Sequence, residues 1–270
     1  MGNIQAGGTG KTPLVALIAR EATNRGLEVC ILTRGYHGKW EKTGGTIRPG
    51  NGVPDVRDCG DEPALLHELV PAAWIGVGAD RLSRFYQVQK VAEKIDLVIL
   101  DDGFQNFQIQ KSLEILALTS KTRDETFYRD WESQLRYADL LIWTKGPAPR
   151  LRSAQPQLEV RFRIPQAVSN SPPLFLIVAV GAPEAVRTGA EEAGYVIRKQ
   201  ISLADHATVP ESKARAWLEE ARLADCRVAI TGKDWMKWRA LGISREEVLV
   251  LEPVADFVSG HELWERLLWG

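Results

Sequence analysis

The sequence Gly2-Asn-Ile-Gln-Ala-Gly-Gly-Thr-Gly-Lys-Thr-Pro13 stands directly before Leu14-Val-Ala-Leu-Ile18, an apolar run with helical spacing. A glycine-rich turn that opens a helix binds phosphate groups, because glycines let backbone N–H groups converge on the oxygens and the helix N-terminus adds its positive dipole. Lys11 would reach the β- and γ-phosphates of a nucleotide, and the Thr12 hydroxyl would bind Mg²⁺. The strict Walker A pattern has glycine at the position of Gln5, so we interpret the stretch as a variant of that loop.

A second element of a nucleotide site follows a later apolar run. The sequence Ile95-Asp-Leu-Val-Ile-Leu100 ends in Asp101 and Asp102. This is the form of a Walker B element, in which a carboxylate at the end of a strand holds Mg²⁺ or its waters. Two acids and a glycine after a strand are also a common turn. The presence of Lys11 in a phosphate-binding loop favours the nucleotide site over the simple turn.

Another acidic pair lies in Gly60-Asp-Glu-Pro63, just before a predicted helix. Acids at this position often do no more than cap the helix and complement its dipole. Alternatively, Asp61 accepts the proton of an attacking hydroxyl, because open α/β sheets gather their ligands at the carboxyl ends of the strands. Both interpretations remain open from these residues alone.

Short β-rich apolar runs alternate with amphipathic segments along the whole chain, which is typical of a mostly parallel sheet with helices on both faces. The 270 residues, 44% of them hydrophobic, suffice for two α/β domains. We therefore expect a P-loop NTPase-like nucleotide-binding core at 1–157, an extended linker at 158–173, and a smaller C-terminal α/β domain at 174–270. The expected strands are 28–33, 74–77, 96–100, 113–117, 140–143, 174–180, 195–201, 227–230 and 247–251. The expected helices are 12–25, 62–69, 79–93, 127–138, 183–193, 210–223 and one that begins near 261.

Composition and charge exclude several classes of protein. The 34 lysines and arginines are balanced by 35 acids, so affinity for nucleic acid through overall positive charge is not expected. The three cysteines are far apart and indicate neither a disulfide framework nor a zinc site, which fits a reducing cytoplasm. No apolar run approaches the length of a membrane-spanning helix.

Seven motifs, taken in order, resemble those of the tetraacyldisaccharide 4'-kinase (lipid A 4'-kinase) family, of which this chain looks like a divergent member. They are Gly-Asn-x-x-x-Gly-Gly-Thr-Gly-Lys-Thr-Pro at 2–13, Thr-Arg-Gly-Tyr at 33–36, Gly-Asp-Glu-Pro at 60–63, Leu-Asp-Asp-Gly-Phe-Gln at 100–105, Ala-Asp-Leu at 138–140, Asp-His at 205–206 and Thr-Gly-Lys-Asp at 231–234. The first and fourth are the most specific, and together the seven span most of the chain.

The resemblance implies transfer of the γ-phosphoryl group of ATP to the 4'-hydroxyl of tetraacyldisaccharide 1-phosphate, a step of lipid A biosynthesis. It implies ATP and Mg²⁺ as cofactors, an acylated disaccharide lipid as substrate, and two α/β domains with the active-site cleft between them. The enzyme would contact the cytoplasmic face of the Gram-negative inner membrane peripherally. Neither nucleic acid nor a protein partner is implied.

The resemblance also implies roles for individual residues. Those that would bind the nucleotide are Gly7, Gly8, Thr9, Gly10, Lys11 and Thr12. Those that would hold the metal are Thr12, Asp101 and Asp102. Those that would carry catalysis are Asp61 as the base, His206 as its support from the second domain, and Lys11. Those that would face the substrate are Arg34, Tyr36, Glu62, Arg81 and Gln105.

Two positions depart from the family pattern, which usually has histidine where Asn106 and Ala207 stand. Asparagine cannot replace a cationic imidazole, so the acceptor side of the site has diverged more than the ATP side. Three alternatives stay open, and the first two are a P-loop kinase of another glycolipid or sugar and a partitioning-type P-loop ATPase switch. A third is a protein that binds nucleotide but has lost the acceptor chemistry.

Overall fold

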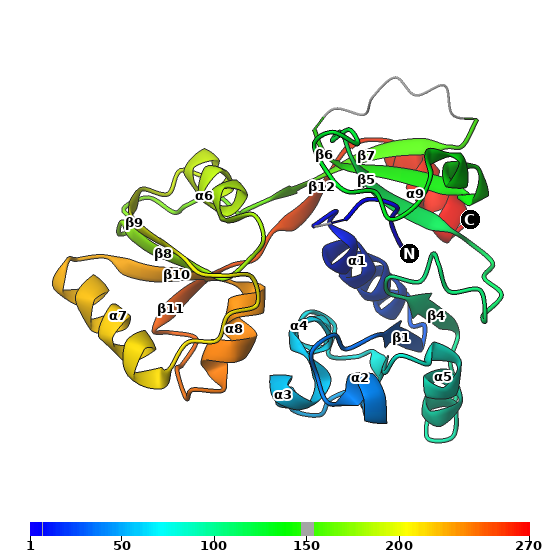
Figure 1. Ribbon diagram of the computed structural model, residues 1–270, viewed down its shortest axis with the longest axis horizontal. Helices are drawn as coiled ribbons and strands as arrows, with labels where there is room; N and C mark the ends of the chain where they lie inside the picture. The colour runs from blue at the N-terminus through cyan, green and yellow to red at the C-terminus, as the bar shows by residue number, and fades with distance from the viewer. Residues whose placement is uncertain (7, 147–153) are drawn as a thin grey trace. The chain divides into compact units, whose positions relative to one another are not determined.

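The structure is a computed structural model that describes residues 1–6, 8–146 and 154–270. The chain divides into two compact units (Figure 1). Unit 1 comprises Met1–Pro54, Asp58–Phe162 and Ala255–Gly270, and unit 2 comprises Asp55–Arg57 and Arg163–Val254. In the sequence, unit 1 is thus interrupted by the two segments that form unit 2.

The first sheet of unit 1 has the strand order β2-β3-β1-β4. Its central strand β1 (Val29–Thr33) pairs in parallel with β3 (Trp74–Val77) and β4 (Leu97–Leu100), and β2 (Gly45–Ile47) is antiparallel to β3. All five residues of β1 are buried, as expected for a parallel strand covered on both faces. The helices of this part are α1 (Lys11–Asn24), α2 (Trp40–Thr43), α4 (Asp61–Leu69) and α5 (Arg81–Gln89), and the short α3 (Val56–Cys59) spans the boundary between the two units.

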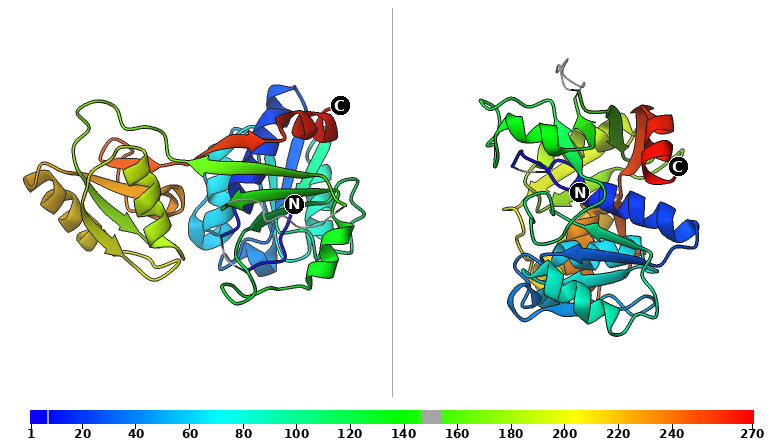
Figure 2. Two further views of the ribbon diagram at one scale, coloured as in Figure 1. Left: turned by 90° about the horizontal axis from the view of Figure 1, so that it is seen from above. Right: turned by 90° about the vertical axis from the view of Figure 1, so that its right-hand side faces the viewer.

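The second sheet of unit 1 has the order β12-β7-β6-β5, and in it β5, β6 and β7 run parallel. Its strands are β5 (Ile115–Thr119), β6 (Leu140–Lys145), β7 (Gln157–Arg163) and β12 (Val254–Ser259), followed by helix α9 (His261–Leu268). Figure 2 shows β7 and β12 as neighbours. The sheet therefore collects strands from the middle and the end of the sequence.

The segment before the phosphate-binding loop lies beside β5. The backbone N–H of Gly2 donates to Ile115 (2.9 Å), and the N–H of Ala117 donates back to Gly2 (2.9 Å). On its other side, the N–H of Gly103, just after β4, donates to Met1 (2.9 Å). The short N-terminal stretch thus occupies the place of the buried strand that normally precedes a phosphate-binding loop.

Unit 2 is a four-stranded parallel sheet of order β11-β10-β8-β9. Its strands are β8 (Leu174–Val178), β9 (Ile197–Ser202), β10 (Arg227–Thr231) and β11 (Val248–Leu251), and its helices are α6 (Pro183–Glu192), α7 (Glu211–Leu223) and α8 (Gly232–Arg239). Leu174, Leu176 and Val178 of β8 form its apolar centre. The predicted α/β class is confirmed, and each unit contains a mostly or wholly parallel sheet.

The division into units differs from the expected domains in two places. Residues 255–270 belong to unit 1 rather than to the C-terminal domain, because β12 pairs with β7 and α9 packs on α1. The expected linker 158–173 begins inside β7, which is a sheet strand whose residues Leu158 and Val160 are buried. The alternation of polar and apolar residues there reflects a strand and not an open connection.

Local elements also differ from expectation. Instead of a helix over 127–138, the chain forms only a 3₁₀ turn, η1 (Glu132–Tyr137). The preceding residues are bonded to the phosphate-binding loop: Ala6 N–H donates to Phe127 (2.7 Å), and Arg129 N–H donates to Ile4 (2.7 Å). Backbone groups used in this way are unavailable for helical bonds. Helix α8, which the periodicity did not predict, begins directly after β10.

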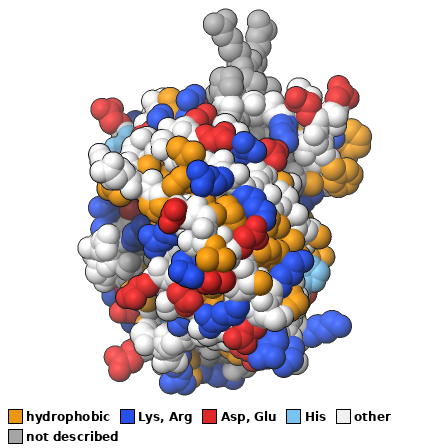
Figure 3. Space-filling model, turned by 90° about the vertical axis from the view of Figure 1, so that its left-hand side faces the viewer, with side chains coloured by type: hydrophobic (Ala, Val, Ile, Leu, Met, Phe, Trp, Pro, Cys, Tyr) orange, Lys and Arg blue, Asp and Glu red, His pale blue; other side chains and the backbone are white. Residues whose placement is uncertain are grey.

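Within the ranges that the structure covers, none of the helices has the length and apolar character needed to cross a membrane. On the face drawn in Figure 3, lysine and arginine side chains are interspersed with acidic ones. This mixture matches the overall balance of charge in the sequence, which is −1.

Candidate active site

The phosphate-binding loop ends at Gly10, which adopts a left-handed conformation (φ 76°) immediately before Lys11 opens helix α1. No side chain caps this helix end in the part of the chain that the structure describes, and the first N–H groups of an α-helix have no partner within the helix, as an anion site requires. A Cβ at Gly10 would lie 2.7 Å from a ring carbon of Phe162. Gly10 is thus required both by its backbone angle and by close packing. Gly7 lies outside the described residues.

Gln5, the residue that departs from the Walker A pattern, anchors the loop. Its Nε2 donates to the carbonyls of Thr119 (3.0 Å) and Lys121 (2.9 Å) and to the hydroxyl of Tyr128 (3.0 Å). Its Oε1 accepts the backbone N–H of Thr119 at 2.7 Å. The side chain is buried and its amide is fully used, so it ties the start of the loop to the carboxyl end of β5.

Thr9 is buried with its side chain turned into the protein. Its Oγ1 accepts a hydrogen bond from Asn3 (3.0 Å), and its carbonyl accepts one from the hydroxyl of Thr144 in β6 (2.9 Å). Only the backbone at this position is available to a phosphate group. Gly8, next to it, is exposed.

Asp101 is the buried carboxylate at the end of β4. Its Oδ2 accepts a hydrogen bond from the hydroxyl of Thr33 in β1 (3.0 Å), whereas its Oδ1 has no partner among the described residues. Burial raises the pKa of Asp101 to about 6, the negative charge of Glu62 adds to this, and Lys11 opposes it. A buried carboxylate oxygen without a partner is the group that a bound cation would satisfy.

Asp102 forms two ion pairs, one with Lys11 and one with Arg129. Its Oδ1 lies 3.4 Å from Nζ of Lys11, and its Oδ2 accepts a bond from the guanidinium of Arg129 at 2.8 Å. Although burial opposes it, the positive charges of Lys11 and Arg129 hold the pKa of Asp102 below its ordinary value. The sequence reasoning missed Arg129, because no spacing or motif links it to Asp102; only its backbone pairing with the loop brings it there.

The residues that would hold a magnesium ion come from two elements. Thr12 is the second residue of α1, and Asp101 and Asp102 directly follow β4. One hydroxyl and two carboxylates are the oxygen ligands that suit Mg²⁺. In the described ranges, no group of three or more His, Cys, Asp or Glu side chains forms a metal cluster. Phosphates and water would complete the octahedral shell that Mg²⁺ prefers.

Asp61 is the first residue of α4 and is buried, with 7% of its surface exposed. The loop that carries Arg34 and Tyr36 packs directly on the turn before it. A Cβ at Gly35 would lie 2.7 Å from the carbonyl oxygen of Cys59, and one at Gly60 would lie 3.0 Å from the carbonyl oxygen of Tyr36. The two glycines permit this close approach, so two of the predicted substrate residues lie beside the predicted base.

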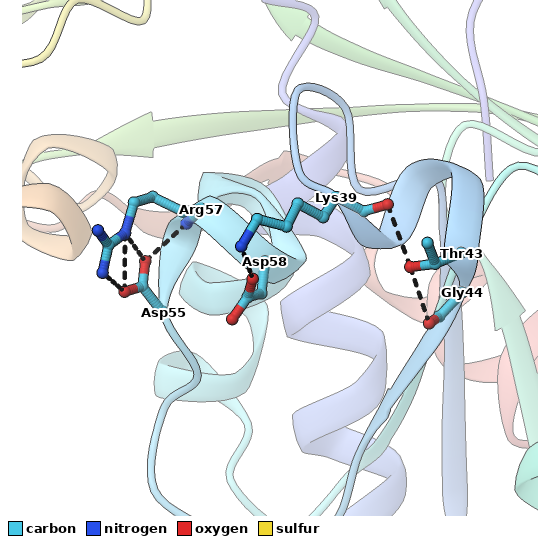
Figure 4. A network of polar contacts seen from close by, with 6 residues as sticks. All are labelled: Lys39, Thr43, Gly44, Asp55, Arg57 and Asp58. Atoms are coloured by element: carbon cyan, nitrogen blue, oxygen red, sulfur yellow. Dashed lines mark hydrogen bonds and ion pairs between the residues drawn. The ribbon is translucent and has the colours of Figure 1, made fainter.

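Polar contacts support this pair of loops (Figure 4). Lys39 Nζ donates to Asp58 at 2.9 Å and so joins the segment before α2 to α3. In the part of this segment that belongs to unit 2, Asp55 accepts bonds from the backbone N–H (2.8 Å) and the guanidinium (2.9 Å) of Arg57. Both contacts are exposed, so we regard them as local surface contacts and not as parts of the site.

Arg81 opens α5 and is 8% exposed. Its Nη1 donates to Ala79 (2.9 Å), while its Nε has no partner among the described residues. Burial, together with the charge of nearby Arg34, lowers the pKa of Arg81, and Asp101 and Asp102 oppose this. Arg81 therefore lies within electrostatic range of both carboxylates and of the Arg34 loop.

The remaining predicted residues have different surroundings. Gln105 donates to the carbonyl of Asn3 (3.1 Å) and to Asp130 (3.1 Å), so it connects the start of the phosphate-binding loop to the segment before η1. His206 lies in unit 2, on a turn after β9, with Nε2 3.8 Å from Oδ1 of Asp205. Unit 1 thus brings together Lys11, Asp101, Asp102, Glu62 and Arg81 by contact or by charge. The pairing of Asp61 with His206 stays a prediction.

The comparison with family models shows to which family the chain belongs. A model described as "LpxK: Tetraacyldisaccharide-1-P 4'-kinase" matches residues 1–269. The chain belongs to this family. The family predicted from the seven motifs is thereby confirmed.

Relatives within the tetraacyldisaccharide 4'-kinase family match most of the chain. The protein named tetraacyldisaccharide 4'-kinase in Geobacter sulfurreducens is 29% identical over 263 residues, which are 89% of this chain and 74% of that protein. The one of the same name in Chlorobaculum parvum is 27% identical and covers 88% of this chain and 73% of its own length.

A solved structure shares the fold of this family member. It is a crystal structure described as the "apo" form of LpxK from Aquifex aeolicus in complex with ATP. The TM-score is 0.76 at 23% identity, and the match covers 98% of this chain and 85% of the other. The likeness supports the α/β architecture over nearly the whole chain.

Proposed function

We propose that the protein transfers the γ-phosphoryl group of ATP to the 4'-hydroxyl of tetraacyldisaccharide 1-phosphate. The observation that carries the proposal is the 3.4 Å contact between Lys11 and Asp102, in a chain that belongs to the tetraacyldisaccharide-1-P 4'-kinase family. The contact joins a phosphate-binding loop to the carboxylates of β4, as nucleotide chemistry requires. The relatives' shared name, tetraacyldisaccharide 4'-kinase, agrees with this function.

The nucleotide half of the reaction rests on the loop and on β4. The backbone of Gly8, Thr9 and Gly10 and the first turn of α1 bind the phosphates, and Lys11 neutralises the charge that develops on the transferred group. Thr12, Asp101 and Asp102 would hold Mg²⁺, which would supply further charge neutralisation. Arg129, bonded to Asp102, keeps that carboxylate oriented.

The acceptor half rests on the loops around Asp61. Asp61 accepts the proton of the sugar hydroxyl, since it opens α4 next to the loop of Arg34 and Tyr36. Those two side chains are exposed, and with Arg81 they contact the disaccharide and its phosphate. The negative charge of Glu62 raises the pKa of Asp101 and so links the acceptor half to the nucleotide half. His206 supports Asp61 as the second catalytic group.

The proposed substrate determines where the enzyme works. Its acyl chains keep it in a lipid bilayer, so the protein meets it in peripheral contact with the cytoplasmic face of the Gram-negative inner membrane. ATP is available on that side.

The test is a purified assay that follows two products of Mg-ATP at once: phosphate on the lipid and free phosphate. We expect transfer to tetraacyldisaccharide 1-phosphate with little hydrolysis when the lipid is left out. Asp61→Asn should lower kcat strongly while the affinity for ATP stays near that of the wild type. Lipid-independent hydrolysis as the only activity would instead identify a partitioning-type ATPase. Transfer to another glycolipid but not to the disaccharide would identify a divergent kinase.

A further inference from the structure

The sequence Thr231-Gly-Lys-Asp234, which opens helix α8, has no role in the nucleotide site. Its two polar ends bind each other: the hydroxyl of Thr231 donates to Oδ2 of Asp234 (2.7 Å) and accepts the backbone N–H of Asp234 (3.3 Å). Asp234 is 3% exposed. Burying a carboxylate costs free energy unless its oxygen atoms accept hydrogen bonds. The partner of its second oxygen therefore matters.

That second oxygen reaches the end of β8. Oδ1 of Asp234 accepts the backbone N–H of Ala179 at 3.1 Å. The carbonyl of the same Ala179 accepts the backbone N–H of His206 at 3.2 Å. One peptide segment therefore connects the buried carboxylate to the histidine, and every atom in this chain of contacts belongs to unit 2.

The other side of the histidine turn is held by the same helix. Lys237 Nζ donates to the carbonyl of Ala207 at 3.4 Å. Asp234 and Lys237 are three residues apart and therefore lie on one face of α8. Within the turn, the backbone N–H of Ala207 donates a hydrogen bond to the carbonyl of Ala204 (2.9 Å).

His206 adopts a left-handed backbone conformation, with φ 60°. Residues other than glycine seldom adopt this conformation, which persists only where the surroundings impose it. Here the N–H of His206 is bound on one side by Ala179, and the next carbonyl, that of Ala207, is bound by Lys237. The contacts made by α8 thus fall on Ala179, whose carbonyl accepts the N–H of His206, and on Ala207, the residue that follows His206.

We propose that Asp234 and Lys237 are positioning residues that hold the His206 turn in its reactive conformation. The inference rests on the catalytic role of His206 given under the proposed function. Neither residue touches a substrate in this account. Each acts through backbone groups: Asp234 through Ala179, and Lys237 through Ala207.

The test uses Lys237→Met, which keeps the length of the side chain and removes the ammonium group. Lys237→Arg is the conservative variant that restores a donor. Lys213→Met is the matched control, because Lys213 is a lysine of the same unit that lies over the ring of Trp217 (5.0 Å). Asp234→Ala removes the acceptor of the Ala179 N–H and so tests the other contact, with the same loss of kcat and the same shift of the His206 signal expected. Urea unfolding of each variant separates a loss of fold from a loss of position.

We expect Lys237→Met to lower kcat for phosphoryl transfer by between about tenfold and a hundredfold, with the KM for ATP unchanged. Lys237→Arg should recover most of the rate, and Lys213→Met should match the wild type. In a His206→Ala background, Lys237→Met should cost nothing further, because a residue that acts only through His206 has no effect once the imidazole is gone.

A second readout does not depend on activity. The imidazole resonances of the four histidines are recorded with labelled histidine, and His206 is assigned by its loss in His206→Ala. We expect Lys237→Met to shift or broaden the His206 signal and to leave those of His37, His67 and His261 in place. An unchanged His206 signal, or a loss of kcat that multiplies with that of His206→Ala, overturns the positioning role. If His206→Ala leaves kcat unchanged, the catalytic role of His206 fails, while a shifted signal in Lys237→Met still supports the positioning.

Discussion

Nζ of Lys11, in the first turn of α1, lies 3.4 Å from Oδ1 of Asp102, which follows the last strand of the first sheet. The two residues come from the two motifs proposed to bind the nucleotide, and the contact brings these motifs together in the fold. Arg129 binds the other oxygen of Asp102 at 2.8 Å, so the carboxylate is held between two cations.

Replacement of Lys11 by methionine should abolish transfer while leaving the fold intact. The variant keeps the apolar stem but removes the charge that neutralises the transferred phosphoryl group, so we expect kcat to fall by at least about a hundredfold. Lys94→Met is the matched control, because Lys94 pairs with Asp96 at 2.7 Å on an exposed surface. Phosphate transfer to the lipid is measured for both. Wild-type turnover in the Lys11 variant would show that the phosphate-binding loop takes no part in the reaction.

Two glycines with the same backbone angle should respond differently to alanine. Gly10 has φ 76° and Gly26 has φ 79°, so each substitution costs about 1–2 kcal/mol for the left-handed conformation. At Gly10 the new Cβ would also lie 2.7 Å from the ring of Phe162, whereas nothing lies within 4 Å at Gly26. We expect Gly10→Ala to lose about 1–3 kcal/mol more in unfolding free energy than Gly26→Ala, and also to lose binding of ATP. Urea unfolding and equilibrium titration with ATP measure the two effects. Equal losses would contradict the packing seen at Phe162.

The sequence predicted what local patterns encode. Apolar runs located β1, β3 and β4 to within one residue, because buried parallel strands read as continuous apolar stretches. The phosphate-binding loop was evident because its chemistry requires particular residue types at fixed spacing. Asp101 and Asp102 were placed by their position after a strand, and the carboxyl ends of parallel strands meet at one edge of a sheet.

What escaped prediction depends on contacts between distant parts of the chain. Arg129 reaches Asp102 only because its backbone pairs with Ile4, and Gln5 is tolerated in the loop only because Thr119 and Tyr128 use its amide. Neither contact produces a periodic pattern in the sequence. The last helix was assigned to the second domain by its position in the chain, whereas strand pairing returns it to unit 1.

Asp234 should make stability depend on pH in a defined direction. Burial raises the pKa of this carboxyl above its unfolded value of 3.8, although Thr231 and Lys237 oppose the shift. The folded state then binds the proton more tightly, so the contribution of this group to the unfolding free energy is fully present below pH 3.8 and is lost as the pH rises through the folded pKa.

The measurement compares Asp234→Asn with the wild type by urea unfolding across this range of pH. Asparagine can accept the N–H of Ala179 and donate to the hydroxyl of Thr231, so it preserves the contacts and lacks the titration. We expect the variant to gain stability relative to the wild type as the pH rises from about 4 toward neutrality. A difference between the two proteins that does not change with pH would show that the folded carboxyl titrates normally.

Glu21 should determine whether the C-terminal helix stays docked. Its Oε2 accepts hydrogen bonds from Nε1 of Trp264 (2.8 Å) and of Trp269 (3.0 Å), and Trp264 is fully buried. Glu21→Ala leaves the indole N–H of Trp264 buried without an acceptor, which costs about 1–3 kcal/mol in unfolding free energy. Amide hydrogen exchange in α9 should then accelerate, because the helix loses its polar link to α1.

Glu265→Gln is the control for this prediction. It breaks the ion pair with Arg25 on the same surface (2.8 Å), but both partners are about 40% exposed, so the loss should stay below about 1 kcal/mol. Glu21→Gln keeps an acceptor oxygen and should fall between the two. Since Glu21 lies near the end of α1 remote from Lys11, we expect kcat to change little in all three variants. Exchange in α9 that is equal for Glu21→Ala and Glu265→Gln would show that apolar packing of Trp264, and not its hydrogen bond, holds the helix.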